Sequence, residues 1–299
     1  MKELVIISGK GGTGKTSVTA GFAALADRAV LADCDVDAAD LHLVLKPRTY
    51  KSEDFSGGKT ARIVAERCTG CGTCAGVCRF GAVILPDPDA GGAYRIDPTA
   101  CEGCKVCVEF CPAAAIAFED TINGRWHIGQ TRFGPLVYAE LGVAEENSGK
   151  LVSLIRKEAR ALAVDKGCDL LIVDGSPGVG CPVIASIAGA DLVLIVTEPT
   201  LSGRHDLGRV ADLARHFGVP AAVCVNKADI NPALSEQICS EAAERSLSVL
   251  ASIPYDPQVT AAQVAGQTII ELGPGPAERA VRRLWEQTLD LLNGRMAAR

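Results

Sequence analysis

The sequence predicts an α/β protein whose main body is a doubly wound, mostly parallel sheet, with a small α+β domain inserted into it. Two observations predict the sheet: near-continuous apolar runs alternate with helical patterns, and a glycine-rich loop follows the first run and opens a helix. A third observation predicts the insertion, because short cysteine-rich segments replace this alternation between residues 59 and 122. We therefore expect one large domain interrupted by a smaller one.

The apolar runs have the length of strands, and their composition indicates strands that are buried on both faces. Such strands lack the alternation of a half-exposed strand, which favours a parallel sheet covered by helices. Apolar residues also recur at helical spacing over 277–292, which predicts a C-terminal helix packed on the core. The predicted strands are 4–8, 29–33, 169–174, 191–199, 221–227 and 249–256.

The composition indicates a soluble globular protein with ample material for a core. Of its 299 residues, 48% are hydrophobic, and the formal net charge is -6. There is no run of eighteen apolar residues to insert into a membrane and no signal-peptide core after the N-terminus, so we expect a cytoplasmic protein. The mild acidity argues against a nucleic acid partner, because neutralising phosphates requires a basic surface.

Eight of the 13 cysteines form two runs in the inserted segment, which fits a reducing compartment better than a disulfide framework. Each run has the spacing C-x2-C-x2-C-x3-C, and the run from Cys101 to Cys111 repeats the run from Cys68 to Cys78, 33 residues later. A Pro/Asp/Gly-rich joint at 86–92 lies between them. The predicted boundaries are 1–58 for the first part of the large domain, 59–122 for the insert and 123–299 for the second part.

This spacing is that of bacterial ferredoxins that hold two [4Fe–4S] clusters, in which the fourth cysteine of each run serves the other cluster. Arg79 follows the last cysteine of the first run, where the second run has Pro112, so the surroundings of one cluster differ. Zinc is the alternative, but three thiolates in one short loop suit the separate irons of a cluster better than one tetrahedral ion. The predicted ligands are Cys68, Cys71, Cys74 and Cys111 for the first cluster and Cys101, Cys104, Cys107 and Cys78 for the second.

The segment GKGGTGKT follows the first predicted strand and fits the phosphate-binding pattern G-x-x-x-x-G-K-[ST]. Its glycines let successive backbone N–H groups turn toward phosphate oxygens, and the start of the helix adds a favourable field. In this interpretation Lys15 bridges the terminal phosphates and the Thr16 hydroxyl binds Mg²⁺. The residues expected to contact the nucleotide are Gly9, Lys10, Gly11, Gly12, Thr13, Gly14, Lys15, Thr16 and Ser17.

Acidic residues follow two further predicted strands, at the sheet edge where ligands bind in doubly wound folds. Asp174 begins the turn DGSPG, where it is suited to hold a water bound to Mg²⁺. Asp33, Asp35 and Asp37 follow the second strand, and we expect one of them to orient the attacking water. The alternative is that these carboxylates cap the following helix.

These motifs resemble those of a known family. The segments GKGGTGKT, DCDVDAADLHL and DGSPG are similar to the deviant Walker A, switch I and switch II segments of the MinD/ParA group of P-loop ATPases. That group includes the nitrogenase iron protein and the Mrp-type iron–sulfur carriers. More closely, the chain resembles MinD-superfamily ATPases with an inserted ferredoxin domain, over nearly its whole length and including residues 129–152.

The resemblance implies an ATP-dependent dimer, formed by two copies or with a related subunit. Lys10 would reach the partner's phosphates, and Asp35 would support hydrolysis. Asn226 would contact the adenine, beside the loop around Pro254. The segment NKAD at 226–229 also fits the N-K-x-D pattern by which GTPases bind guanine, but the family resemblance favours ATP. The catalytic residues would be Lys10, Lys15, Asp35 and Asp174.

The remaining cysteines carry a weaker signal. Cys181 follows Asp174 at a spacing similar to that of a cluster ligand in the nitrogenase iron protein, but the chain has no cysteine at that family's other ligand position, so packing is favoured. Ser148 is expected to cap the helix after it rather than to form a second phosphate site. The other four cysteines are expected to be small buried apolar residues or incidental thiols: Cys34, Cys168, Cys224 and Cys239.

Three functions remain after these observations. The first is a redox ATPase, in which the nucleotide cycle of a dimer controls electron transfer from the two clusters to an unidentified acceptor protein. The second is an assembly or carrier ATPase for iron–sulfur clusters or metallocofactors. Four cysteines per cluster and the absence of the C-terminal C-x-x-C of Mrp-type carriers favour the first. The third, a ParA-like positioning ATPase with structural clusters, lacks a basic patch and a membrane helix.

Overall fold

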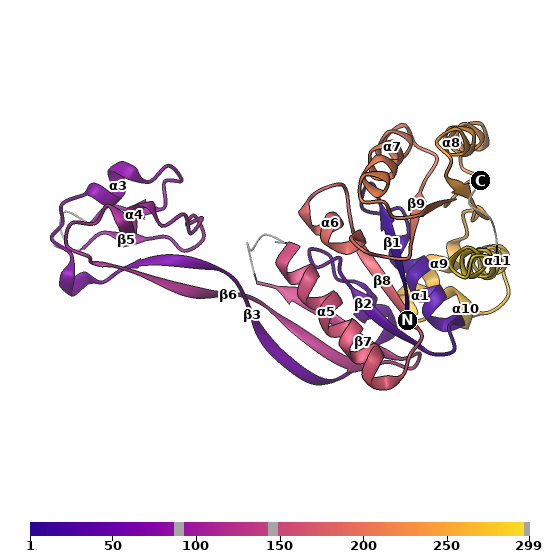
Figure 1. The fold of residues 1–299 in the computed structure, drawn as a ribbon, viewed down its shortest axis with the longest axis horizontal. Helices are drawn as coiled ribbons and strands as arrows, with labels where there is room; N and C mark the ends of the chain where they lie inside the picture. Colours follow the sequence, from indigo (N-terminus) through magenta and orange to yellow (C-terminus); the bar gives the residue numbers. More distant parts are fainter. Residues whose placement is uncertain (87–92, 143–148, 296–299) are drawn as a thin grey trace. The chain divides into compact units, whose positions relative to one another are not determined.

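The computed structural model describes residues 1–86, 93–142 and 149–295, and the chain divides into two compact units (Figure 1). The larger unit contains Met1–Glu53, Trp126–Glu140 and Asn147–Arg299. The smaller unit contains Asp54–Arg125 and Leu141–Glu146. A segment from the middle of the chain therefore forms most of the smaller unit.

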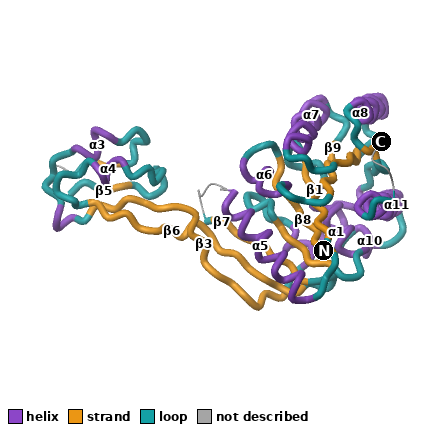
Figure 2. The backbone as a smooth tube through the Cα atoms, viewed as in Figure 1, coloured by secondary structure: helices purple, strands orange, loops and turns teal. Residues whose placement is uncertain are grey.

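The larger unit alternates strands and helices, as the apolar runs predict (Figure 2). Two long strands, β3 (Arg48–Ile63) and β6 (Ile116–Gln130), connect it with the smaller unit. The other elements are β1 (Lys2–Ser8), α1 (Lys15–Leu25), β2 (Ala29–Asp33), α2 (Leu41–Leu45), β7 (Pro135–Leu141), α5 (Gly149–Lys166), β8 (Leu170–Pro177), α6 (Cys181–Ile187), β9 (Leu192–Thr197), α7 (Leu201–His216), β10 (Ala221–Val225), α8 (Pro232–Glu244), β11 (Ser248–Val249), α9 (Pro257–Ala265), α10 (Ile269–Leu272) and α11 (Pro276–Leu292).

The strands form one sheet in the order β11-β10-β9-β1-β8-β2-β7-β6-β3. The central neighbours β10, β9, β1, β8 and β2 all run parallel, which confirms the predicted mostly parallel sheet. The strand predicted over 249–256 is wrong for most of its length. Only β11 and an isolated bridge between Asn226 and Ile253 remain, and between them the N–H of Ala251 donates to the Gln287 side chain on α11 instead of to a strand.

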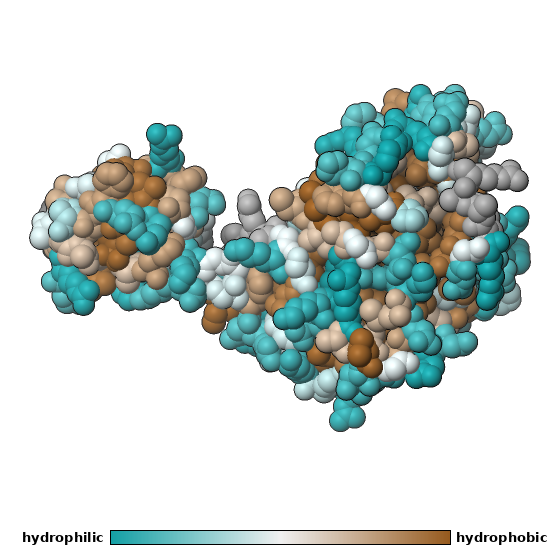
Figure 3. Space-filling model, in the orientation of Figure 1, coloured by the Kyte–Doolittle hydropathy of each residue, from teal (hydrophilic) through white to brown (hydrophobic). Residues whose placement is uncertain are grey.

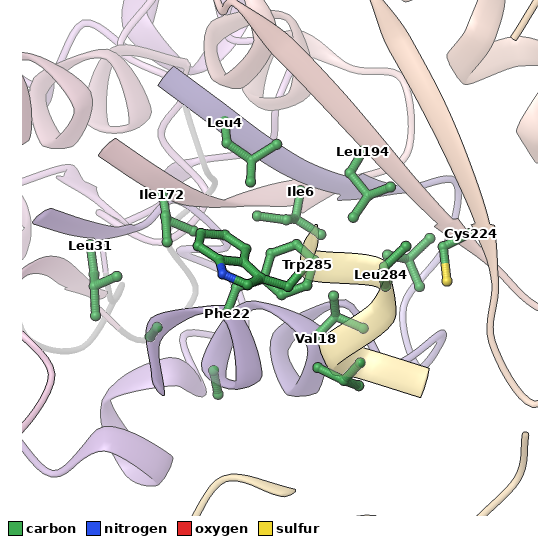
Figure 4. Close-up of a cluster of buried hydrophobic side chains, with 14 of the residues drawn as sticks. Leu4, Ile6, Val18, Phe22, Leu31, Ile172, Leu194, Cys224, Leu284 and Trp285 are labelled. Carbon is green, nitrogen blue, oxygen red and sulfur yellow. The ribbon is translucent and has the colours of Figure 1, made fainter. Parts of the chain in front are cut away.

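Helices α1 and α11 cover one face of this sheet. The rings of Phe22 on α1 and Trp285 on α11 lie 4.9 Å apart between centroids, and Figure 4 shows them packed beneath Ile6 and Ile172. Leu284 has no exposed surface. The predicted C-terminal helix is confirmed, and its apolar side completes the core under the strand that leads into the glycine loop.

The smaller unit has short elements and a small core. Its buried cluster consists of Ala61, Cys74 and Ile116, with partly buried residues packed around it. Apolar side chains also lie on its surface, as Figure 3 shows, and Phe80, Leu85 and Phe110 are among those exposed. Besides parts of β3 and β6, the elements are η1 (Ala65–Arg67), α3 (Thr73–Val77), β4 (Val83–Ile84), β5 (Arg95–Ile96) and α4 (Val106–Glu109).

The long strands β3 and β6 do not follow from the predicted apolar runs. Most of β3 is exposed or half-exposed, so its sequence has no continuous apolar run. Polar pairs join the strands instead: the hydroxyls of Thr60 and Thr121 lie 2.6 Å apart, and Lys59 lies 3.0 Å from Asp120. Such cross-strand pairs stabilise an exposed ladder without leaving a hydrophobic signal.

The described residues contain no helix that could span a membrane. None of the helices there has both the length and the apolar composition needed to cross a bilayer.

Truncating the core beneath the glycine loop should destabilise the larger unit. We expect Leu284→Ala to lower the free energy of unfolding by about 2–5 kcal/mol, because it leaves a cavity at a fully enclosed site. Urea denaturation followed by far-ultraviolet circular dichroism measures the change. The control is Glu286→Ala at an exposed position of α11, expected to stay within about 0.5 kcal/mol. A loss below 1 kcal/mol in Leu284→Ala would show that α11 does not complete this core.

Candidate functional site

The glycine-rich segment forms a loop between β1 and α1 that lines a cavity of about 420 Å³. At Gly14 the backbone has φ 92°, and a Cβ there would lie 2.2 Å from the amide nitrogen of Asn226, so only glycine fits. The Thr13 hydroxyl is buried and has no hydrogen-bond partner among the described residues. The loop therefore offers a helix start and an unpaired hydroxyl to an anionic ligand.

Lys15 and two carboxylates meet beside this loop. The Nζ of Lys15 lies 2.9 Å from Asp174 Oδ1 and 3.2 Å from Asp35 Oδ2. Thr16 donates its hydroxyl to Asp174 Oδ2 at 2.7 Å, and Thr19, almost one turn later, donates to Oδ1 at 2.8 Å. The predicted phosphate lysine, magnesium threonine and acidic strand end are thus in direct contact.

Asp33 holds the loop after β2 instead of lining the cavity. It pairs with Asp174 in the register of the parallel strands β2 and β8, and it is fully buried. Its carboxylate accepts hydrogen bonds from the N–H groups of Asp35 and of Leu41, the first residue of α2, both at 3.1 Å. The capping alternative therefore describes Asp33, whereas Asp35 and Asp37 line the cavity.

Burial and charge shift the pKa values of these groups. Burial lowers the pKa of Lys15, but the charges of Asp174 and Asp35 outweigh it and raise that pKa above its ordinary value. Burial raises the pKa of Asp33 and of Asp35, and Lys15 opposes both shifts. Lys15 therefore stays positively charged, and a second positive charge in the site would stabilise the ionised forms of Asp33 and Asp35.

Lys10, predicted to act across a dimer, is bound within its own chain. Its ammonium lies 2.6 Å from Glu198 Oε1 and 3.3 Å from the Thr200 hydroxyl. The other oxygen of Glu198 lies 3.1 Å from the Nζ of Lys227. Glu198 was not among the predicted residues, although its place just after the apolar run of β9 is a signal of the kind that identified Asp174.

Asn226 and Lys227, at the end of β10, brace the glycine loop. The Asn226 amide donates to the carbonyl of Thr13 at 2.7 Å, and the Lys227 ammonium donates to the carbonyl of Gly12 at 3.1 Å. Both residues also line the cavity. The predicted base contact of Asn226 thus coincides with a structural role that the sequence did not reveal.

The residues around Pro254 bear on which base the cavity accepts. Pro254 lines the cavity, as does Gln263 on α9, whose amide donates to the Ser17 hydroxyl at 2.8 Å. Asp229, the last residue of NKAD, instead accepts a hydrogen bond from the N–H of Tyr255 at 2.6 Å and does not line the cavity. No sequence motif marks Gln263, because its helix brings it to the site from far along the chain.

The eight clustered cysteines divide between two cavities in the smaller unit. In each, three cysteines come from one run and the fourth comes from the other run. The first cavity is lined by Cys68, Cys71, Cys74 and Cys111, together with Thr69, Thr73 and Tyr94. The second cavity is lined by Cys78, Cys101, Cys104 and Cys107, together with Glu102, Lys105 and Val106.

Within the described ranges, no group of three or more His, Cys, Asp or Glu side chains could hold a metal ion. A tetrahedral ion draws its thiolates to within about 4 Å of one another, because Zn–S bonds are about 2.3 Å long. Each cavity brings together four thiols, which is the ligand number of a [4Fe–4S] cluster, so its donor set is chemically suited to that group.

The other cysteines lie outside these cavities. Cys34 and Cys224 are buried, as predicted, and Cys168 and Cys239 are half-buried. The expectation that Cys181 packs in the core is wrong, because it is exposed at the first residue of α6, whose Val183, Ser186 and Ile187 turn inward instead. Ser148, the predicted helix cap, lies outside the described residues.

Comparisons with known proteins agree with this geometry. Residues 4–269 match the family model of the CobQ/CobB/MinD/ParA nucleotide binding domain. The chain is 36% identical over 232 residues to an uncharacterized protein of Methanocaldococcus jannaschii, covering 77% of this chain and 79% of that protein. The solved structure of the cell division ATPase MinD from Pyrococcus furiosus has a TM-score of 0.58 at 20% identity, over 97% of this chain and 99% of that one.

A second solved structure has the same fold. The septum site-determining protein MinD from Pyrococcus horikoshii, complexed with Mg-ADP, has a TM-score of 0.59 at 16% identity, over 99% of this chain and 98% of that one. At these identities the likeness concerns the fold of the chain.

The raised pKa of Asp35 predicts that its charge destabilises the folded protein at neutral pH. A carboxyl whose pKa is raised on folding costs stability above its folded pKa and costs nothing below its ordinary pKa of 3.8. We expect Asp35→Asn to raise the midpoint of thermal unfolding at pH 7, and the gain to shrink as the pH falls toward 4. Asp165→Asn, at an exposed position, is the control. A lower midpoint at pH 7 would mean that the Lys15 ion pair outweighs burial.

Proposed function

The chain belongs to the CobQ/CobB/MinD/ParA family of nucleotide-binding domains, which places it among ATPases of the MinD/ParA type, and on this premise we propose that it is a redox ATPase. It binds Mg-ATP at the glycine loop, and its nucleotide cycle governs electron transfer through two [4Fe–4S] clusters in the smaller unit. One observation carries the proposal: a phosphate-type cavity and two cavities of four cysteines each occur in the same chain.

The contacts of Asp174 support a magnesium-dependent site. Lys15 would face the anionic oxygens of a triphosphate, and the Thr16 hydroxyl would be a ligand for Mg²⁺. Asp174, which accepts a hydrogen bond from Thr19, would hold a water on the metal. Asp35 lines the cavity beside Lys15 and orients the attacking water.

The surroundings of NKAD favour adenine over guanine. A guanine site needs a carboxylate directed at the base, and Asp229 is instead bonded to the N–H of Tyr255, away from the cavity lining. The Asn226 and Gln263 amides lie at the cavity, and each can both donate and accept, which suits the edge of adenine. ATP is therefore the better candidate.

The grouping of the cysteines supports two clusters. Each cavity offers four thiols, which is the complete ligand number of a [4Fe–4S] cluster. When bound, a cluster accepts and releases single electrons. A carrier that delivers clusters needs a weakly or jointly held one, so four thiols from one chain favour electron transfer over the assembly or carrier ATPase, which is the second candidate. A zinc site would need the thiols of one cavity to converge on one ion.

In the proposed dimer cycle, the ion pair between Lys10 and Glu198 has to open. Lys10 must leave Glu198 before it can reach phosphates bound by a partner subunit, which is either a second copy or a related chain. Lys227 is also bound to Glu198 and compensates its charge when Lys10 leaves. Closure of the dimer therefore exchanges one ion pair of Lys10 for another.

Removal of the phosphate lysine should separate the two functions of the chain. We expect Lys15→Ala to weaken ATP binding by roughly 30-fold or more, because truncating one member of a buried charged pair costs about 2 kcal/mol or more. Iron content should be unchanged, since the cysteine cavities lie in the other unit. Isothermal titration calorimetry and iron analysis measure both, with the exposed Lys166→Ala as control. Parallel loss of iron would contradict two independent sites.

Removal of one cavity cysteine tests the ligand sets. We expect Cys74→Ser to lower the iron of the anaerobically reconstituted protein by about one cluster, roughly four of eight iron atoms per chain. The matched control is Cys181→Ser, which removes an exposed thiol outside both cavities. Full iron retention in Cys74→Ser would contradict the assignment, and one zinc per cavity would support the structural alternative.

A further inference from the structure

The two cysteine cavities differ although their sequences repeat. Position by position, the first run reads Cys-Thr-Gly-Cys-Gly-Thr-Cys and the second reads Cys-Glu-Gly-Cys-Lys-Val-Cys. Thr69 and Thr73 of the first cavity thus correspond to Glu102 and Val106 of the second. Two hydroxyl groups are replaced by a carboxylate and an aliphatic side chain, at equivalent distances along the chain from the ligands.

The first cavity supplies hydrogen bonds to its sulfurs. The Thr73 hydroxyl lies 3.4 Å from the Cys71 sulfur, and a metal-bound thiolate carries no proton, so the hydroxyl would be the donor. The backbone N–H of Ala115 donates to the Cys111 sulfur at 3.3 Å. Both donors place partial positive charge on ligand sulfurs, which favours the more negatively charged, reduced state of a bound cluster.

The second cavity lacks this side-chain donor. Val106, the counterpart of Thr73, has no hydroxyl to donate to a sulfur, and the backbone N–H of Val108 interacts with the Cys107 sulfur. Glu102 also lines this cavity, and its negative charge opposes the addition of an electron.

The nearby cations do not reverse this difference. Lys105 lines the second cavity, but its ammonium lies 2.5 Å from Glu109, which compensates its charge. Arg67 precedes a ligand of the first cavity and Arg79 follows a ligand of the second, and both are exposed, so their effects are similar on the two sides. The hydroxyls and Glu102 remain as the main differences.

We infer that the first cavity holds a reducing electron more tightly than the second, so that the cluster of Cys68, Cys71, Cys74 and Cys111 has the higher reduction potential. This inference rests on the proposed function, since it requires both clusters. The residues that set the order are Thr73 in the first cavity and Glu102 with Val106 in the second. The pair therefore has a direction: the second cavity receives an electron less readily and passes it to the first.

The experiment is an anaerobic redox titration of the full chain followed by electron paramagnetic resonance. Cys74→Ser, which is expected to keep only the second cluster, assigns the signals. In the native protein the first cluster should be reduced at the higher potential. Thr73→Val should lower the potential of the first cluster only, and Val106→Thr should raise that of the second only. Thr121→Val, which removes a hydroxyl bonded to Thr60, is the control and should shift neither.

The outcomes separate the inference from the proposed function. A native chain that binds no iron after reconstitution overturns the proposed function and the inference with it. Two clusters of equal or reversed order, or no shift in either variant, overturn the inference alone. Glu102→Gln gives a second test where a variant fails to assemble, because removing the carboxylate should raise the potential of the second cluster. An unchanged potential there also counts against it.

Discussion

The larger unit depends on how one buried carboxylate is neutralised. Asp174 has no exposed surface at the end of β8, so its charge must be met inside the protein. Its three donors, Lys15, Thr16 and Thr19, all come from the start of α1. The carbonyl of the same residue accepts a hydrogen bond from Cys34, just after β2, at 2.8 Å. The central strands and the first helix are therefore fixed to one another at the position where a phosphate loop needs them.

The same neutralisation leaves a surplus of negative charge. Burial raises the pKa of both Asp33 and Asp35, and the Lys15 ammonium opposes both shifts while it also faces Asp174. Such an arrangement costs stability, and it also provides the environment in which Mg²⁺ is bound most favourably. Glu198 likewise pairs with the Lys10 ammonium, at 2.6 Å, within the same chain. The site is thus organised around charges that its proposed ligands would balance.

The smaller unit obeys a different constraint. One buried apolar cluster consists of Ala61, Cys74 and Ile116, and eight side chains of the unit are cysteines gathered around two cavities. The proposed clusters would add to the stability of this unit, because the free energy of metal binding is also a free energy of folding. The polar ladder of β3 and β6 does not depend on them, since its stability comes from local cross-strand pairs.

The sequence by itself determined the parallel sheet, the glycine loop with Lys15 and Thr16, and Asp174, because each rests on a local pattern: a continuous apolar run or a motif of fixed spacing. It did not determine β3 and β6, whose exposed residues have no apolar period, nor the shortened strand before Pro254. Only the tertiary structure decided that Asp33 braces α2 and that Glu198 holds Lys10. Lys10 and Glu198 are far apart in the chain, and the register of the parallel strands β1 and β9, which no local pattern encodes, brings them together.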